Sequence, residues 1–192
     1  MSTVSGDDLD VIELLQRQHR EITGLFSKVE MTTGDQRRQA FEQLVRLLAV
    51  HETAEEEVVH PAARAAGGDD VVRARLREEH DAKELLQQLD KLGPDHEHFM
   101  DAFRRLRDDV TVHAANEERE EFPALRERHD RDRLKSMAAA VRAAEAVAPT
   151  HPHPGVESGT ANATVGMVAA VMDRARDAVR KAMGHSTTGT SE

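Results

Sequence analysis

Apolar residues recur along this chain at intervals of three and four, the spacing that places side chains on one face of an α-helix. The first stripe consists of Ile12, Leu15, Ile22, Phe26 and Val29. His19 fills the missing step between Leu15 and Ile22, so a histidine is expected to face the core. The chain breaks at Thr33, Gly34 and Asp35 before the next stripe begins.

Three more stripes follow, and two of them also contain histidine and glutamate. The second stripe consists of Phe41, Leu44, Leu48, His51, Glu55, Val58 and Ala62. The third consists of Val72, Leu76, Leu86 and Leu89, with His80 on its shoulder. The fourth consists of Phe99, Phe103, Leu106, Val110, His113, Glu117 and Ala124. Short turns between long helices predict an all-α fold, an antiparallel up-and-down four-helix bundle over residues 9–130.

Two additional C-terminal helices are expected after the bundle. A helix is predicted over residues 131–148, a flexible Pro-, Gly-, Ser- and Thr-rich linker over 149–163, and an amphipathic helix over 164–183. Residues 1–8 and 184–192 are expected to be flexible ends. The last helix could dock on the bundle, on a second copy to form a homodimer, or on another partner, and docking within the chain is the favoured reading.

Composition narrows the function classes. The 192 residues have a net charge of −10, which argues against a nucleic-acid partner because phosphate binding needs clustered cations. Cysteine is absent, which excludes thiolate metal sites and thiol catalysis. No signal-like or membrane-spanning segment is visible, so a cytoplasmic protein with no membrane partner is expected.

The chain contains the same motif twice. Residues 51–64 read HETAEEEVVHPAAR and residues 113–126 read HAANEEREEFPALR. Each copy has a histidine about one helix upstream, because His19 lies 32 residues before His51 and His80 lies 33 before His113. Each copy of the motif contains a proline, Pro61 or Pro123, which is expected to kink or end its helix.

The repeated spacing is typical of a metal centre. His and Glu at i and i+4 share one helix face, and a buried carboxylate is costly unless a cation neutralises it. The candidate metal ligands are His19, His51, Glu55, His80, His113 and Glu117. Four imidazoles and two carboxylates suit iron, and also manganese or zinc, and would leave coordination positions open for a small molecule.

Two further residues near the motif stay open as contributors. Glu52 directly follows His51, but Ala114 occupies the matching place in the second copy. His60 precedes Pro61 where Phe122 stands in the other half, and it is expected to support the site or face the surface.

The complete constellation resembles the hemerythrin-like, HHE cation-binding domains, over about residues 9–130. The resemblance implies a non-haem di-iron centre, oxo- or hydroxo-bridged, in which Glu55 and Glu117 bridge the irons and the four histidines cap them. It also implies a function in binding or reacting with O2, H2O2 or NO, with peroxide breakdown of catalase type or iron and oxygen sensing as alternatives. The oxygen-carrying hemerythrins have more histidines, so reversible oxygen carriage does not transfer. The ligands alone do not distinguish binding from enzymatic turnover, and they identify no catalytic residue.

Overall fold

The computed structural model describes residues 9–65, 68–147 and 165–186, and within these ranges the chain forms helices and no strand. The helices are α1 (Val11–Met31), α2 (Gly34–Ala54), η2 (Glu55–Val59), α3 (His60–Ala65), α4 (Asp69–Leu92), α5 (Phe99–Asn116), η3 (Glu117–Glu121), α6 (Phe122–Arg128), α7 (Arg131–Val147) and α8 (Val165–Ser186). The predicted all-α bundle with two additional helices is confirmed.

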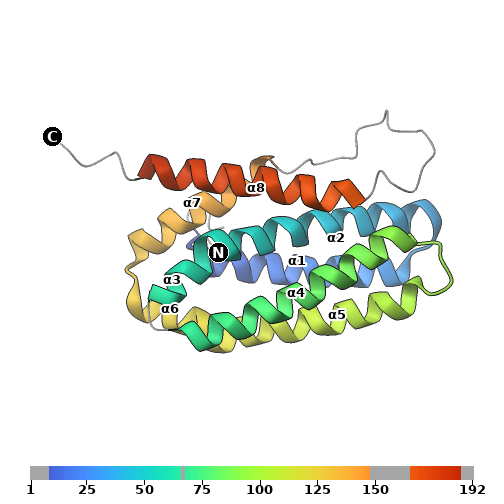
Figure 1. The fold of residues 1–192 in the computed structure, drawn as a ribbon, viewed down its shortest axis with the longest axis horizontal. Helices are drawn as coiled ribbons and strands as arrows, with labels where there is room; N and C mark the ends of the chain where they lie inside the picture. Colours follow the sequence, from blue (N-terminus) through green and yellow to red (C-terminus); the bar gives the residue numbers. More distant parts are fainter. Residues whose placement is uncertain (1–8, 66–67, 148–164, 187–192) are drawn as a thin grey trace, which may run out of the picture.

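The bundle consists of two helical hairpins packed together (Figure 1). Helix α1 pairs with α2, and α4 pairs with α5, through short connections. The first hairpin starts sharply because Asp10 and Glu13 form a reciprocal capping box at the N-terminus of α1. Helix α4 ends at Gly93, whose φ of 75° a residue without a side chain adopts at no steric cost.

Each motif-bearing helix contains one π-helical turn. In η2 the His60 N–H donates to Glu55 O, and in η3 the Phe122 N–H donates to Glu117 O, so both bonds span five residues. Of the two outcomes expected at the prolines, a kink or a helix end, the end does not occur: the helical path continues past both prolines through α3 and α6, and a π-helical turn lies just before each proline. The wider π-helical turn explains how the helix can continue past the proline. Proline supplies no N–H and crowds the carbonyl four residues before it, and the wider turn relieves both constraints.

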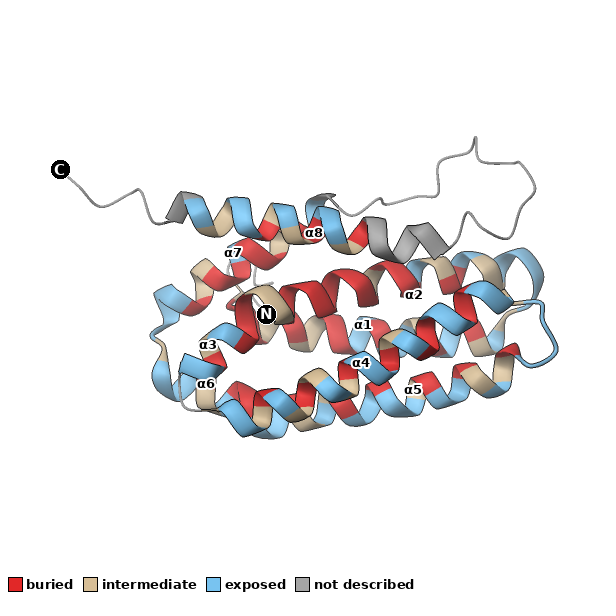
Figure 2. Ribbon diagram, viewed as in Figure 1, coloured by how far each residue is buried: buried red, intermediate tan, exposed pale blue. Residues whose placement is uncertain are grey.

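The apolar core is divided into two clusters along the bundle. One includes Leu15, Val58 and Phe122, together with α7 and α8, and the other includes Phe26, Phe41 and Phe103. In sequence, His19, His113 and Glu117 fall between a member of one cluster and a member of the other, whereas His51 and Glu55 lie among members of the first cluster. The buried residues follow the inward faces of the helices (Figure 2), so the polar layer is flanked by apolar packing on both sides.

The two C-terminal helices pack on the bundle. Helix α8 lies along α2 and α7 (Figure 1) and buries Val171, Ala175 and Val179. Arg176 and Arg180 of this helix both donate to the Glu57 carboxylate, at 2.9 Å and 3.1 Å from their Nε atoms. In the structure, α8 therefore docks on the bundle of its own chain, which is the first of the three docking modes that the sequence left open.

Three sequence expectations fall outside the described residues. They concern the N-terminal segment 1–8, the linker 149–163 and residues 187–192 of the tail. Residues 184–186 were expected to belong to the tail, but they complete helix α8. Among the helices that the structure describes, none combines the length and the apolar character needed to cross a lipid bilayer.

Candidate metal centre

Five of the six predicted ligands meet in the polar layer of the bundle. They are His19 from α1, His51 from α2, Glu55 from η2, His113 from α5 and Glu117 from η3. Both glutamates are fully buried, and the three histidines are exposed by 7 % or less. The i, i+4 spacing works as expected, because His51 lies against Glu55 and His113 against Glu117.

Four of these residues converge on one point, which we call position one. The candidate ligand atoms of His19, His51, Glu55 and Glu117 all lie within 4.8 Å of one another. His19 Nε2 is 3.3 Å from Glu117 Oε2, and His51 Nε2 is 3.2 Å from Glu55 Oε1. The centroids of the His19 and His51 rings are 4.9 Å apart, and the rings meet edge to face.

The other oxygens of the two glutamates face His113. Its Nε2 is 3.5 Å from Glu117 Oε1 and 3.8 Å from Glu55 Oε2. Glu52 joins Glu55 and His113 in a second group whose ligand atoms lie within 4.8 Å of one another. We call this group, with Glu117 Oε1, position two. Each shared glutamate thus directs one oxygen toward each position, which is the arrangement of a bridging carboxylate.

The donor atoms of the cluster fit a metal better than they fit one another. His19 Nε2, His113 Nε2, Glu52 Oε2 and both oxygens of Glu55 and Glu117 are buried without a hydrogen-bond partner. Buried polar atoms are normally paired, because desolvation without a partner is costly. Unpaired nitrogen and oxygen donors aimed at a common centre have the make-up of a metal-binding site.

The opposite nitrogen of each imidazole is held by a partner from another helix. His19 Nδ1 lies 2.7 Å from Glu118 Oε1, His51 Nδ1 lies 2.8 Å from Gln18 Oε1, and His113 Nδ1 lies 3.0 Å from Glu78 Oε2. A proton on Nδ1 donated to these oxygens leaves Nε2 as the free donor at each ring. Glu118 belongs to the second copy of the motif, but Gln18 and Glu78 lie outside both copies, so the motif held no signal for these two partners.

Burial raises the pKa of two glutamates in the cluster and lowers the pKa of one histidine. Desolvation raises the pKa of Glu55 and of Glu117 to about 8, with mutual repulsion adding to the shift of Glu55. Burial also holds the pKa of His51 well below its ordinary value, and the charges of neighbouring imidazoles act in the same direction. Metal binding at these carboxylates must therefore displace protons, as expected for ligands that bind in the deprotonated state.

The structure does not bring His80 to the cluster. Its side chain is 71 % exposed, and its Nε2 lies 3.5 Å from Glu84 Oε1 on the surface of α4. The preceding residue, Glu79, faces inward and is 1 % exposed. Consecutive helix residues differ by about 100° in direction, so only one of this pair can face the core. In the sequence, His80 lies at the edge of its apolar stripe and not at its centre, and this position was the feature that could have predicted its exposure.

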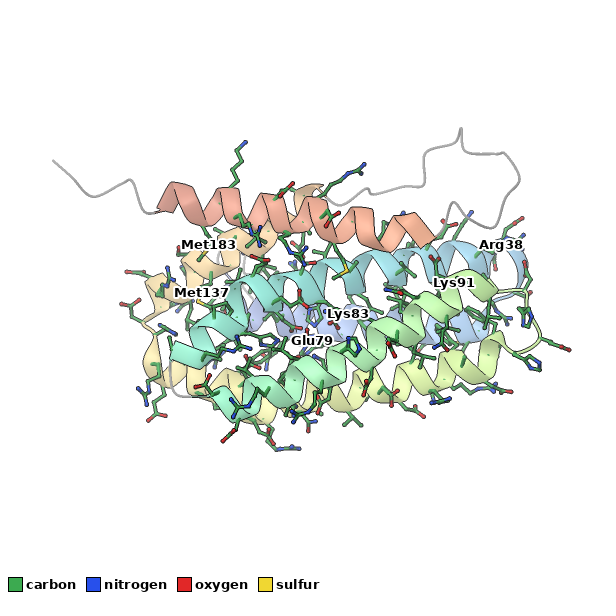
Figure 3. All side chains as sticks on the ribbon, in the orientation of Figure 1. Arg38, Glu79, Lys83, Lys91, Met137 and Met183 are labelled. Carbon is green, nitrogen blue, oxygen red and sulfur yellow. The ribbon has the colours of Figure 1, made fainter. Side chains whose placement is uncertain are left out.

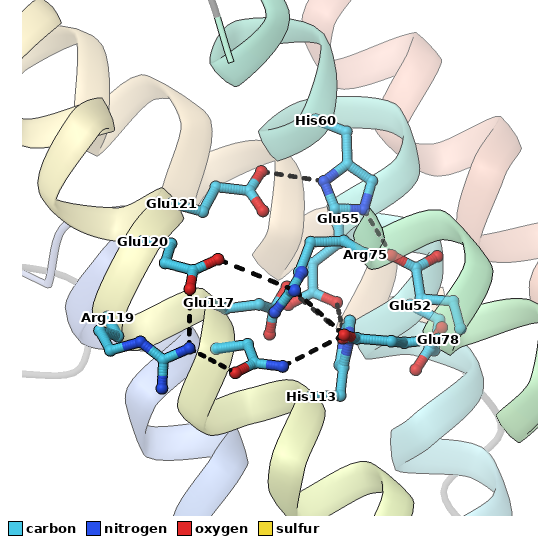
Figure 4. A network of polar contacts seen from close by, with 12 residues as sticks. Glu52, Glu55, His60, Arg75, Glu78, His113, Glu117, Arg119, Glu120 and Glu121 are labelled. Carbon is cyan, nitrogen blue, oxygen red and sulfur yellow. Dashed lines mark hydrogen bonds and ion pairs between the residues drawn. The ribbon is translucent and has the colours of Figure 1, made fainter. Parts of the chain in front are cut away.

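Glu79 binds His60 rather than the cluster. His60 Nε2 is 2.5 Å from Glu79 Oε1. On the other side of the ring, His60 Nδ1 is 2.9 Å from Glu121 Oε1, a pair that Figure 4 shows. Burial opposes a charge on His60, but the two carboxylates outweigh it and raise its pKa to about 10. His60 is thus a buried cation with both nitrogens engaged, next to the metal cluster and separate from it.

Lys83 continues this network toward position two. Its Nζ lies 2.5 Å from Glu56 Oε1, 3.3 Å from Glu79 Oε2 and 3.5 Å from Glu52 Oε2. Glu79 and Lys83 lie near the middle of the bundle (Figure 3). Burial together with repulsion from Glu79 raises the pKa of Glu52 to about 8, although Lys83 opposes the shift.

A cavity of about 360 Å³ between α1 and α5 leads to the cluster. Its inner wall includes His19, His51 and His113, and its outer part includes the exposed residues Thr23 and Thr111. A water molecule occupies about 30 Å³ of liquid volume. Small molecules therefore have room beside the three imidazole rings, in a cavity whose outer part is exposed to solvent.

Comparisons with known proteins agree with this geometry. The model of the hemerythrin HHE cation-binding domain matches residues 10–125, more than half of the chain. A protein of Nostoc sp. (strain PCC 7120 / SAG 25.82 / UTEX 2576) called DNA nickase is 28 % identical over 139 residues, which are 72 % of this chain and 40 % of that protein. No solved structure matches the chain. On its sequence match and its buried His/Glu cluster, the chain belongs to the hemerythrin HHE cation-binding family.

Proposed function

We propose that this protein holds two iron ions without haem and binds or reacts with a small oxidant, O2, H2O2 or NO. The observation that carries the proposal is the set of buried, unpartnered nitrogen and oxygen donors arranged around two adjacent positions. Mixed imidazole and carboxylate donors suit iron, with manganese and zinc as substitutes. Iron bound there would supply redox chemistry and an open coordination position.

The protein's own residues would hold and orient that centre. Glu55 and Glu117 would bridge the ions, and His19, His51 and His113 would bind through Nε2 because Nδ1 of each ring faces an oxygen of Glu118, Gln18 or Glu78. The cavity between α1 and α5 would admit the small molecule to the imidazole side. His80 is left out of this ligand set, because its side chain is at the surface.

The test uses purified full-length protein loaded with two irons and reduced without air. The chain has no Tyr or Trp, so absorption in the near ultraviolet and visible comes from the centre. Exposure to O2, H2O2 or NO is expected to change that spectrum, and His113→Ala is expected to abolish the change while the exposed His98→Ala preserves it. The proposal fails if the loaded protein responds to none of the three molecules. Continuous O2 release from peroxide would favour the catalase-like alternative.

A sensing role is the second candidate, because α8 is tied to the helical turn that carries Glu55. Arg176 and Arg180 both bind Glu57, two residues after the proposed bridging ligand. A change in ligand geometry at Glu55 would therefore act on the docking of α8. Amide hydrogen exchange of α8 in the metal-free, reduced and oxidised protein tests this role, which requires protection that differs among the three states.

DNA is not proposed as a partner. The DNA nickase of Nostoc is a longer protein, and this chain spans 40 % of it. The net charge of −10 opposes binding to a phosphate backbone. Supercoiled plasmid incubated with the iron-loaded protein is expected to stay supercoiled, and accumulation of nicked circles that requires the metal would contradict this.

A further inference from the structure

The two metal positions have different donor sets. Position one has two imidazole nitrogens, His19 Nε2 and His51 Nε2, with one oxygen from each shared glutamate. Position two has one imidazole nitrogen, His113 Nε2, with the remaining oxygens of the shared glutamates and the Glu52 carboxylate. The duplicated motif would predict equal positions, so the difference arises where the two halves differ: Glu52 stands opposite Ala114, and the upstream His80 does not join the cluster as His19 does.

Helix α4 is the source of the difference. It directs Glu79 inward, and that carboxylate is bound to His60 and Lys83. The imidazole of His80, which would have matched His19, is on the surface. Glu52 is 5 % exposed and its Oε2 has no hydrogen-bond partner, so it offers position two an oxygen where an imidazole nitrogen was expected.

Ligand type determines which ions a site prefers. Imidazole donors suit iron and zinc, whereas carboxylate oxygens suit harder ions such as manganese and magnesium. We propose that the two positions differ in metal preference: when both metals are supplied, position one takes an imidazole-preferring ion such as Fe²⁺ first and position two takes a harder divalent ion such as Mn²⁺ second, whereas iron supplied alone fills both. This inference rests on the proposed function only in that the cluster binds metal, and it does not depend on any oxidant.

Lys83 adds to the difference in affinity. Its ammonium lies 3.5 Å from Glu52 Oε2, so a cation entering position two meets a nearby positive charge and competes for that carboxylate. No basic side chain is paired with Glu55 or Glu117 from outside the cluster among the ion pairs of the described residues, where their partners are the cluster histidines. Position one is therefore expected to fill before position two.

The decisive experiment loads the full chain in two steps. Metal-free protein receives one equivalent of Fe²⁺ without air, then excess Mn²⁺, and unbound metal is removed before elemental analysis. Anomalous X-ray diffraction at the iron and manganese edges then assigns the ion at each position. Iron beside His19 and His51 with manganese beside His113 and Glu52 supports the inference. The same mixture at both positions, or the reverse assignment, overturns it.

Variants separate this inference from the proposed function. Glu52→Gln is expected to retain one ion per chain and lose the second, whereas the matched Glu56→Gln, which also contacts Lys83, retains two. Lys83→Met is expected to tighten the second binding step about tenfold, the effect of removing one nearby charge at partial burial. Glu52→His is expected to shift the preference of position two toward Fe²⁺.

The inference is contradicted if Glu52→Gln, with unchanged helical circular dichroism, loses both ions or loses neither. A wild-type chain that binds no ion removes the proposed function as well.

Discussion

His60 Nε2 lies 2.5 Å from Glu79 Oε1 in the core, so the positive charge of the imidazolium and the negative charge of the carboxylate neutralise each other there. Glu121 binds the opposite nitrogen of the same ring. A buried cation between two carboxylates is costly to break, because removal of one partner leaves charge without compensation. This group stabilises the bundle beside the metal centre, and its chemistry can be tested apart from metal binding.

Replacement of this histidine by Phe, the residue at the matching position of the second repeat, is expected to destabilise the fold strongly. His60→Phe leaves Glu79 and Glu121 buried without their shared cation, and the expected loss is about 3–5 kcal/mol in the free energy of unfolding. Denaturant titration followed by circular dichroism measures it. The triple variant with Glu79→Gln and Glu121→Gln is expected to recover part of the loss, and no recovery would contradict the charge argument.

The same histidine predicts how stability depends on pH. Its pKa is raised from 6.5 to about 10, so its contribution is complete below pH 6.5 and is lost as pH rises through about 10. The difference in unfolding free energy between the wild type and His60→Phe is therefore expected to shrink toward alkaline pH. A difference that grows between neutral and alkaline pH would show that the histidine is not held as a cation.

Glu78 is expected to control metal affinity without binding metal. It accepts from His113 Nδ1 and is itself held by Asn116. Loss of such a partner typically reduces metal affinity 10- to 100-fold, and Glu78→Ala is expected to fall in that range, measured by competition with a chelator. Glu84→Ala is the matched control on the same helix, since Glu84 faces the exposed His80. Equal effects of both variants would rule out a specific role for Glu78.

His80→Ala is expected to leave metal content unchanged, because the side chain is 71 % exposed. His19→Ala, its counterpart in the repeat, is expected to lower metal content, since its Nε2 faces position one. Elemental analysis of both variants after identical loading makes the comparison. Metal loss in His80→Ala equal to that in His19→Ala would mean that α4 turns on metal binding.

Docking of α8 is expected to depend on its apolar face more than on its ion pairs. Val171 is 1 % exposed, and Val171→Asp places a charge in that contact, so amide protection across α8 is expected to fall sharply. Arg180→Ala is expected to cost less than about 1 kcal/mol, because this arginine is 64 % exposed. The control is Val112→Asp at a side chain that is 58 % exposed. Unchanged exchange in Val171→Asp would contradict the apolar docking.

The sequence predicted the bundle and five cluster residues because both depend on local spacing. The stripes that contain His19, His51 and His113 each identified a buried face, and the i, i+4 pairs then followed from helix geometry. Each histidine and glutamate predicted from its own stripe is buried in the cluster, and its role as a metal ligand stays a prediction. The placement of His80 depended on symmetry with His19, and the structure replaced that symmetry with an inward Glu79.

The remaining features depend on how separate helices meet. Gln18 pairs with His51 across 33 residues, and His60 pairs with Glu121 across 61, distances along the chain at which spacing carries no information. The π-helical turns had a sign in the sequence, since a proline follows six residues after each of Glu55 and Glu117. A proline inside a helix predicts a kink or an end of that helix, and it does not by itself predict a π-helical turn.

The division of the core into two apolar clusters affects how this protein can be loaded with metal. Each cluster packs its own apolar side chains, and Phe122 of the first cluster also stacks on the His19 ring. The helices can therefore stay assembled at both ends while the polar layer between them gains, loses or exchanges its ions. Assembly of the centre would then be a late step on a folded protein, and the supply of each metal, more than the folding of the chain, would decide which form accumulates.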